Sequence, residues 1–434
     1  MASATVKTRI LIISDTHGAK PHVKPPSRTS DGNNQPGDDG GDNDNEDELT
    51  SSPTAKLLHH SPTGFRDPLP EADVAIHCGD LTRRSTVAEF AATFSFLSAL
   101  RAPLKLVIAG NHDLALDAEH WFAGLDEDEE EDEEQDEDHK EWQARALQEC
   151  RDDYRAVRDI VSHAEAHGVR YLAGEGTHAF ALPNGARLSL YASPYTPAFG
   201  GWAFQYPSGE HAFGIPSRAS AVDAAVDVVV THGPPLGVLD GAGVAQLRGL
   251  PPEHPATEHA GCDALFRAVH AARPQLHCFG HIHESWGAYL ATWRDDDDDN
   301  ADDGEADGER ADAQHLQQQR HQQHQPTVHS AIDSSASQFV LTARELKPQT
   351  HADLPAVTPD QVRRLARLSR QRCVHVDTTA DGGGLPTRLQ KGRQTLFVNA
   401  SIMDIHYRPS QLPWLVDLDL PRAEARQDDA GPST

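Results

Sequence analysis

Five short polar motifs along this chain carry residues that could bind metal ions. They read DTH, GD, GNHD, THG and GHIH, in that order. Together they hold seven candidate ligands: Asp15, His17, Asp80, Asn111, His232, His281 and His283. Carboxylate, amide and imidazole ligands suit borderline divalent ions such as Mn, Fe and Zn. Because no cysteine is among them, the set differs from a structural zinc cage.

The number of candidate ligands indicates two metal ions rather than one. Seven side chains exceed a single tetrahedral shell, but they suit two ions about 3.5–4 Å apart that share one carboxylate. Such a pair can bridge a water molecule, lower its pKa and direct it at a phosphorus atom. His112 is left over and could protonate the departing alkoxide, and the next residue, Asp113, could orient it. The motifs therefore predict the hydrolysis of a phosphoester.

Each motif directly follows a short apolar run rich in β-branched residues, at 9–14, 73–78, 104–109, 226–230 and 276–279. Such runs are typical of strands that are buried on both faces. His77 and His277 fall inside two of the runs and are expected to lie in the core or to support the ligands. Helices are predicted between the runs at 85–100, with Ser85 as the cap, and at 141–167 and 261–272. This alternation predicts an α/β fold in which the loops leaving the strands meet at one crevice.

One domain is predicted from residues 8–294 together with 393–421, with further strands at 187–193, 287–293, 395–400 and 414–420. Within it, 27–52 and 126–138 are polar or acidic insertions. Residues 295–392 contain an Asp run and a Gln/His tract, and we expect this low-complexity insertion to be largely disordered. One helix is predicted inside it at 358–371, with Thr358 as its cap and Pro359 in the first turn. Residues 422–434 form a C-terminal tail.

The charge of the chain limits its partners. It has 434 residues and a formal net charge of −29, which weighs against nucleic-acid binding by the whole surface. The acidic tracts could instead recruit a basic protein partner. The five cysteines show no C-x-x-C spacing, as is typical of reduced thiols, and no run reaches the ~20 apolar residues of a membrane span. We expect a cytoplasmic protein, with the nucleus as an alternative location, and no membrane partner.

The ordered motif set resembles the calcineurin-like metallophosphoesterase superfamily. Further matching segments are YASPYTP at 191–197, GWAF at 201–204, THGPPLG at 231–237 and FGHIHE at 279–284. With these, the chain looks like the metallophosphoesterase-domain-containing family, which has brain-expressed animal members and many fungal ones. The resemblance implies a layered αββα sandwich, in which two mixed β-sheets are flanked by helices.

The resemblance also implies roles for the ligands. The first metal ion would be held by Asp15, His17, Asp80 and His283, and the second by Asp80, Asn111, His232 and His281. Asp80 would bridge the two ions and His112 would be the acid. If the chain stays extended from His281 to His283, both side chains point to the same side, and each can reach a different ion. Gly280 would permit the close backbone turn before them.

We therefore expect a phosphodiesterase that hydrolyses small nucleotide-type diesters, by attack of a hydroxide that bridges two divalent ions. After Asp80 the chain reads LTRR, where the protein serine/threonine phosphatases have VDRG, so a small phosphoester is a better expectation than a phosphoprotein. The alternative is a catalytically weak scaffold whose metal ions hold a phosphorylated ligand. A nuclease is a third possibility, disfavoured by the acidic charge and by the lack of a basic stripe with interleaved aromatic residues.

Overall fold

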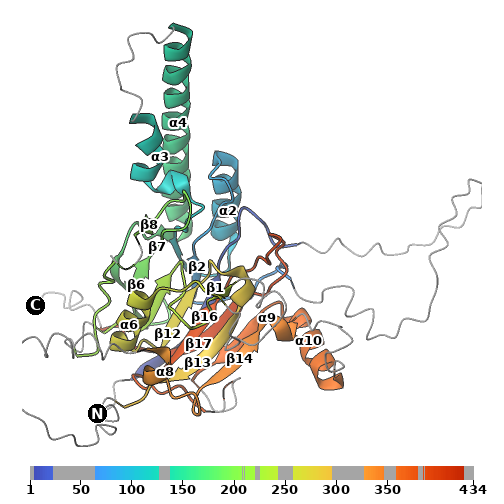
Figure 1. Cartoon of the computed structure of the whole chain (residues 1–434). Helices are drawn as coiled ribbons and strands as arrows, with labels where there is room; N and C mark the ends of the chain where they lie inside the picture. The colour runs from blue at the N-terminus through green and yellow to red at the C-terminus, as the bar shows by residue number, and fades with distance from the viewer. Residues whose placement is uncertain are drawn as a thin grey trace, which may run out of the picture.

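Two mixed β-sheets form the frame of the protein (Figure 1). The computed structural model describes residues 4–22, 64–126, 137–207, 209, 211–219, 225–242, 258–295, 327–346, 358–379, 385 and 387–424. In the first sheet the strand order is β15-β17-β1-β2-β3-β4, and β1 to β4 run parallel. Its strands are β1 (Thr5–Ile13), β2 (Val74–Cys78), β3 (Leu104–Ile108), β4 (Val169–Tyr171), β15 (Val374–Asp377) and β17 (Trp414–Pro421).

The second sheet has the order β14-β13-β16-β12-β9-β6-β5, with β6, β9, β12 and β16 parallel at its centre. Its strands are β5 (Gly176–Ala181), β6 (Arg187–Ser193), β9 (Val228–Thr231), β12 (Leu276–Phe279), β13 (Gly287–Thr292), β14 (Gln338–Thr342) and β16 (Gln394–Asn399). Antiparallel strands at the edges of both sheets make them mixed, as the resemblance implied.

The sheets pack face to face, and helices cover their outer faces. Along β1, Ile10 and Ile12 point between the sheets, whereas Leu11 and Ile13 point to the helical layer. That layer is α2 (Val87–Ala99) and α4 (Glu137–Ala164), and the second sheet is covered by α6 (Asp263–Ala272) and α8 (Val328–Ala331). Because strand residues alternate between two apolar environments, the strands read as continuous apolar runs. The αββα sandwich is confirmed.

The other elements of the described residues lie between these strands and helices along the chain. They are η1 (Leu114–Leu116), α3 (Ala118–Asp126), η2 (Glu165–His167), β7 (Thr196–Pro197), β8 (Gln205–Tyr206), β10 (Gly241–Ala242), β11 (Glu258–His259), η4 (His283–Ser285), α9 (Ala343–Leu346) and α10 (Pro359–Gln371). The long helix α4 extends well beyond the sheets, and α3 lies alongside it (Figure 1). Among the described residues, no helix combines the length and the apolar character needed to cross a bilayer.

Helix ends agree with the sequence signals at α10 but not at α2, and α4 begins at Glu137, four residues before the predicted start. Thr358 caps α10, as predicted, and Pro359 occupies its first turn. At α2 the cap is Thr86 rather than Ser85, because Thr86 and Glu89 form a reciprocal capping box. Ser85 instead adopts a positive φ of 60° and accepts a hydrogen bond from the amide of Ala115.

Within the predicted insertion 295–392, the described residues include strands and short helices that the prediction did not place. β14 pairs with β13 at the edge of the second sheet, and β15 pairs with β17 at the edge of the first. These strands are only four or five residues long, but they bury Leu341, Val374 and Val376. The average composition of the segment concealed such short apolar runs. The predicted insertion 27–52 lies outside the described residues, as does 126–138 apart from its two ends, which belong to α3 and α4.

Candidate metal centre

The five motifs meet where the two sheets come together, at the carboxyl ends of β1, β2, β3, β9 and β12. Backbone hydrogen bonds join their loops. Within the first sheet, the amide of Asp15 donates to the carbonyl of Gly79 at 3.0 Å. In the second sheet, Gly280 donates to the carbonyl of His232 at 3.0 Å. Between the sheets, the amide of His281 donates to the Asp15 carboxylate at 3.1 Å. The loops are therefore fixed relative to one another.

Asp80 lies at the centre of the cluster and offers one oxygen to each side. Its Oδ2 lies 3.5 Å from His17 Nε2, and its Oδ1 lies 3.3 Å from His232 Nε2. On the first side, Asp15 Oδ1 lies 3.3 Å from His283 Nε2. On the second side, Asn111 Oδ1 lies 2.9 Å from His232 Nε2. Ligand atoms of Asp15, His17 and His283, and of Asp15, Asp80 and His232, fall within 4.8 Å of one another.

Three of the histidines have the tautomer that a metal ligand needs. The Nδ1 atoms of His17 and His232 lie 2.9 Å from the carbonyl oxygens of Thr82 and Cys78. His283 Nδ1 lies 3.2 Å from the carbonyl oxygen of Asp404. A carbonyl oxygen can only accept, so each Nδ1 carries a proton, and in the neutral form of each ring Nε2 presents its lone pair to the cluster. This donor set and its outer hydrogen bonds fit divalent metal ions.

His281 reaches the cluster in a different way from the one predicted. The backbone is not extended there, because His281 adopts a φ of 68° and His283 begins the turn η4. His281 is a partly buried residue, and its ring nevertheless lies 5.0 Å from that of His232, whereas the ring of His283 lies 5.4 Å from that of His17. The two imidazoles therefore face the two sides of the cluster, as expected, but a turn separates them.

Backbone strain is concentrated at the candidate ligands. Asp15, His17, Asp80 and His281 have φ angles of 55°, 45°, 55° and 68°, respectively. Residues other than glycine held in this region cost about 1–3 kcal/mol each, and they persist only where the surroundings hold them. The sequence carried no signal for this conformation.

Glycines next to the ligands allow the loops to approach closely. A Cβ atom on Gly280 would overlap the Asp15 carboxylate, and one on Gly110 would overlap Asp80 Oδ1 and crowd the ring of His232. Both glycines directly precede a candidate ligand in their motifs. Their missing side chains therefore give space for the ligands of neighbouring loops.

Burial and charge divide the histidines into two kinds. Burial lowers the pKa of His17 and of His281 to about 4 and keeps both rings neutral. Burial also disfavours the charged form of His232, but the adjacent Asp80 carboxylate outweighs it and raises the pKa to about 9. The pKa of His283 is likewise raised, by its hydrogen bond to Asp15, against the effect of burial. In the metal-free protein at neutral pH, His232 therefore carries a second proton, on Nε2, and is positively charged.

Loading the metal-free protein with Mn²⁺ at pH 7 should release at least one proton per molecule. A metal ion must displace the proton on His232, since only a neutral imidazole can be a ligand. Apparent affinity should rise with pH and level off as pH approaches about 9, the pKa of His232. The test is calorimetric titration in buffers of different ionisation enthalpy. Equal heats in all of them at pH 7 would contradict this assignment of the proton.

His112 lies beside the cluster in a well-defined orientation. Its backbone amide donates to Asp80 Oδ1 at 3.0 Å, and its Nδ1 lies 3.0 Å from the carbonyl oxygen of Arg83. The ring packs against Trp202 with 4.1 Å between centroids and lies 6.2 Å from Tyr407. As in the other three histidines, Nδ1 carries the proton toward a carbonyl oxygen, which leaves Nε2 for the reaction site.

Asp113 does not contact the imidazole of His112 as predicted. Its carboxylate accepts the amides of Gly110, Leu81 and Thr82 at 2.9–3.0 Å, and the hydroxyl of Thr82 at 2.8 Å. It therefore ties the loop after β2 to the loop after β3. Asp113 is a positioning residue, because it acts on the ligands through the backbone.

Trp202, Tyr407 and Arg83 form a rim around His112 that motif spacing could not identify. The Tyr407 ring lies 4.9 Å from that of His17, and the Arg83 guanidinium carbon lies 4.6 Å from the Tyr407 centroid. The amide of Ala203, the residue after Trp202, donates to the carbonyl of Asn111 at 3.2 Å. Trp202 falls in one of the segments that carry the resemblance, whereas Tyr407, more than 100 residues after the last motif, has no comparable signal.

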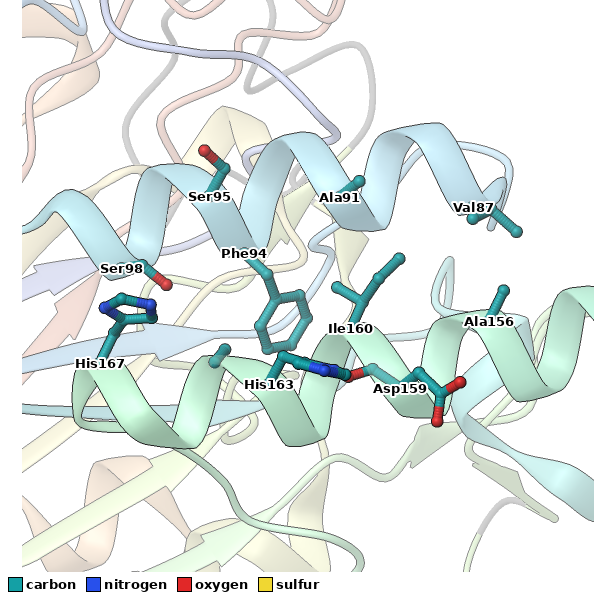
Figure 2. A pocket seen from close by; sticks show the side chains of 11 residues that line it. Val87, Ala91, Phe94, Ser95, Ser98, Ala156, Asp159, Ile160, His163 and His167 are labelled. Carbon is teal, nitrogen blue, oxygen red and sulfur yellow. The ribbon is translucent and has the colours of Figure 1, made fainter.

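A concave feature lies in the outer helical layer, between α2 and α4 (Figure 2). Phe94 and Ile160 line it, together with the more polar His163 and His167 (Figure 2). None of its lining residues is a candidate ligand, so the groove is separate from the metal centre.

Comparisons with known proteins agree with the geometry of this centre. The family model of the calcineurin-like phosphoesterases matches residues 8–285. The chain is 30% identical over 220 residues to metallophosphoesterase domain-containing protein 1 of Homo sapiens and of Mus musculus, which covers 50% of this chain and 56% of each relative. It is also 30% identical over 228 residues to probable rhamnogalacturonate lyase C of Emericella nidulans, covering 52% of this chain and 16% of that protein. The chain thus spans little more than half the length of its mammalian relatives.

Proposed function

The chain belongs to the calcineurin-like phosphoesterase family, and we propose that it is a two-metal hydrolase of small phosphodiesters. The observation that carries the proposal is the convergence of the seven candidate ligands from five loops, with Asp80 at their centre and His112 beside them. Such a set provides for two ions and leaves one imidazole for proton transfer.

The two oxygens of Asp80 support its role as the bridge. Asp15, His17, Asp80 and His283 would hold one ion, and Asp80, Asn111, His232 and His281 the other. Ions of the Mn, Fe or Zn type would lower the pKa of a water molecule and offset charge on the phosphoryl oxygens when bound. The protein contributes the fixed positions of these ligands, through the outer hydrogen bonds to Thr82, Cys78 and Asp404.

His112 is placed so that its doubly protonated ring could deliver the proton on Nε2 to the leaving oxygen. Its Nδ1–H is held by the Arg83 carbonyl and its ring by Trp202, so only Nε2 is available to a substrate. A positioned acid of this kind is needed when the leaving group is a poor one, such as the alkoxide of a sugar.

The rim supports small nucleotide-type diesters as the substrate class. Trp202 is 37% exposed, so part of its indole surface is open beside the proposed acid. Tyr407 and the Arg83 guanidinium border the same region. A planar leaving group could stack on this surface, and the guanidinium could pair with an anionic substrate. The rim therefore favours a diester with an aromatic or heteroaromatic group.

Metal-loaded protein should hydrolyse bis-p-nitrophenyl phosphate faster than p-nitrophenyl phosphate in the presence of Mn²⁺. Replacing Trp202 with leucine should raise KM for the diester by roughly tenfold, because stacking on an aromatic side chain contributes about 1–3 kcal/mol. Phe199→Leu is the matched control, since that ring is 82% exposed on the same loop, and its KM should not change. Tight phosphate binding with no metal-dependent rate on any ester would instead indicate a binding protein.

A further inference from the structure

Two fully buried histidines are absent from the ligand set but make the same bond in the two sheets. His77 Nε2 lies 3.0 Å from the hydroxyl of Thr16, and His277 Nε2 lies 2.9 Å from the hydroxyl of Thr231. Neither Nδ1 atom has a hydrogen-bond partner among the described residues. Each imidazole therefore has one polar contact, and in both cases it is with a threonine next to a metal ligand.

The direction of these bonds follows from the third partner. The hydroxyl of Thr231 lies 2.7 Å from the carbonyl oxygen of Gly233. That of Thr16 makes a longer contact of 3.4 Å with the carbonyl oxygen of Leu81, which also accepts the hydroxyl of Thr93 at 2.9 Å. A hydroxyl that donates its only proton to a carbonyl oxygen must accept from the ring. Burial lowers the pKa of His77 and of His277 to about 3, so each ring is neutral and has a single N–H, on Nε2.

Because the strands involved are neighbours in their sheets, each bond links two loops that carry candidate ligands. His77 lies on β2, which leads to Asp80, and Thr16 lies between Asp15 and His17 after the adjacent β1. In the second sheet, His277 lies on β12, which leads to His281 and His283. Its partner Thr231 ends the adjacent β9 and directly precedes His232. The two ties thus occupy corresponding places in the two sheets.

We propose that the His77–Thr16 and His277–Thr231 pairs are positioning pairs, each of which sets the metal ligands of its own sheet. The proposal rests on the two-metal centre proposed above. Without the threonine hydroxyl, the ring N–H has no acceptor and the ligand loop loses its tie. Loss of the first pair should weaken chiefly the ion held by Asp15 and His17, and loss of the second chiefly the ion held by His232.

The experiment replaces each threonine with valine, which has the same shape but no hydroxyl, and with serine, which keeps the hydroxyl. Mn²⁺ binding to the metal-free proteins is followed by the electron paramagnetic resonance of the free ion. In Thr16→Val and in Thr231→Val, one of the two ions should bind roughly 10- to 100-fold more weakly, the usual cost of losing an outer hydrogen bond to a metal site. The serine variants should bind both ions nearly as the wild type does.

Thr395→Val is the matched control. Thr395 is a buried threonine at the opposite end of the second sheet, and it has the same bonding pattern. It accepts from the Trp293 ring N–H at 2.9 Å and donates to the Pro274 carbonyl at 2.7 Å. This variant should lower Tm without changing metal affinity. If Thr16→Val and Thr231→Val behave in the same way, the two pairs are merely structural and the proposal is overturned.

The outcomes also separate this proposal from the proposed function. If the wild type binds no pair of Mn²⁺ ions, the two-metal centre itself fails. If the wild type binds two ions and the valine variants match it, only the positioning role fails. Should a valine variant not fold, His77→Leu and His277→Leu remove the same bond from the ring side, and the same selective loss is expected.

Discussion

Replacing Asp80 with asparagine is expected to abolish binding of at least one metal ion and to lower kcat/KM by roughly 10³-fold or more. The asparagine amide keeps the shape of the side chain but has one oxygen and no charge. It therefore cannot offer an oxygen ligand both on the side of His17 and on the side of His232. A metal ion supplies several kcal/mol of stabilisation to the transition state, and each 1.36 kcal/mol is about tenfold in rate. Metal analysis of the purified variant, together with its rate on bis-p-nitrophenyl phosphate, measures both effects.

Asp377→Asn is the control for this substitution. Asp377 ends β15 on the first sheet and pairs with Lys7, at the far end of β1 from the metal centre. Its replacement should leave metal content and turnover unchanged, because this half-exposed pair contributes little. If Asp80→Asn keeps two ions per molecule and wild-type turnover, the bridging role is wrong.

Replacing His112 with glutamine is expected to lower kcat by roughly 10²- to 10⁴-fold for diesters with a poor leaving group, the usual contribution of a positioned acid. The loss should be much smaller for p-nitrophenyl esters, because p-nitrophenolate is a stable anion that leaves without a proton. Metal content should be retained. The ring of His112 lies outside the ligand groups, and its backbone amide, which donates to Asp80, is still present in the variant.

A series of diesters with increasingly basic leaving groups provides the measurement. The rate of the glutamine variant should fall more steeply along the series than that of the wild type. His163→Gln, a substitution on the outer helix α4, should follow the wild-type dependence. Parallel dependences for His112→Gln and the wild type would show that another group delivers the proton.

The ligand residues could be found from sequence because each follows a strand in a recognisable motif. Parallel strands end at the same edge of a sheet, so the loops after β1, β2 and β3 had to lie together. The edge strands β14 and β15 could not be found in this way. Their four or five residues are stabilised by pairing with β13 and β17, and such pairing has no local pattern in a polar segment.

Roles that depend on the orientation of a side chain also could not be predicted from the sequence. Asp113 follows His112 directly, yet its carboxylate faces the amides of Leu81 and Thr82, because the chain turns between the two side chains. The condition of an extended chain from His281 to His283 is not met for a similar reason, since His281 adopts a left-handed conformation. Adjacency along the chain does not determine where two side chains point once the backbone leaves regular structure.

The kinds of ligand atom, their number and the strands that carry them to one edge could all be read from the amino-acid sequence. The way in which these groups act together depends on the packing of the folded chain. This packing brought the loops of two sheets into contact, turned each Nε2 inward through a carbonyl bond at Nδ1, and placed Trp202 and Tyr407 beside His112. The physical reason is that ligand identity is a property of single residues, whereas distance and orientation arise from the packing of segments far apart in the chain.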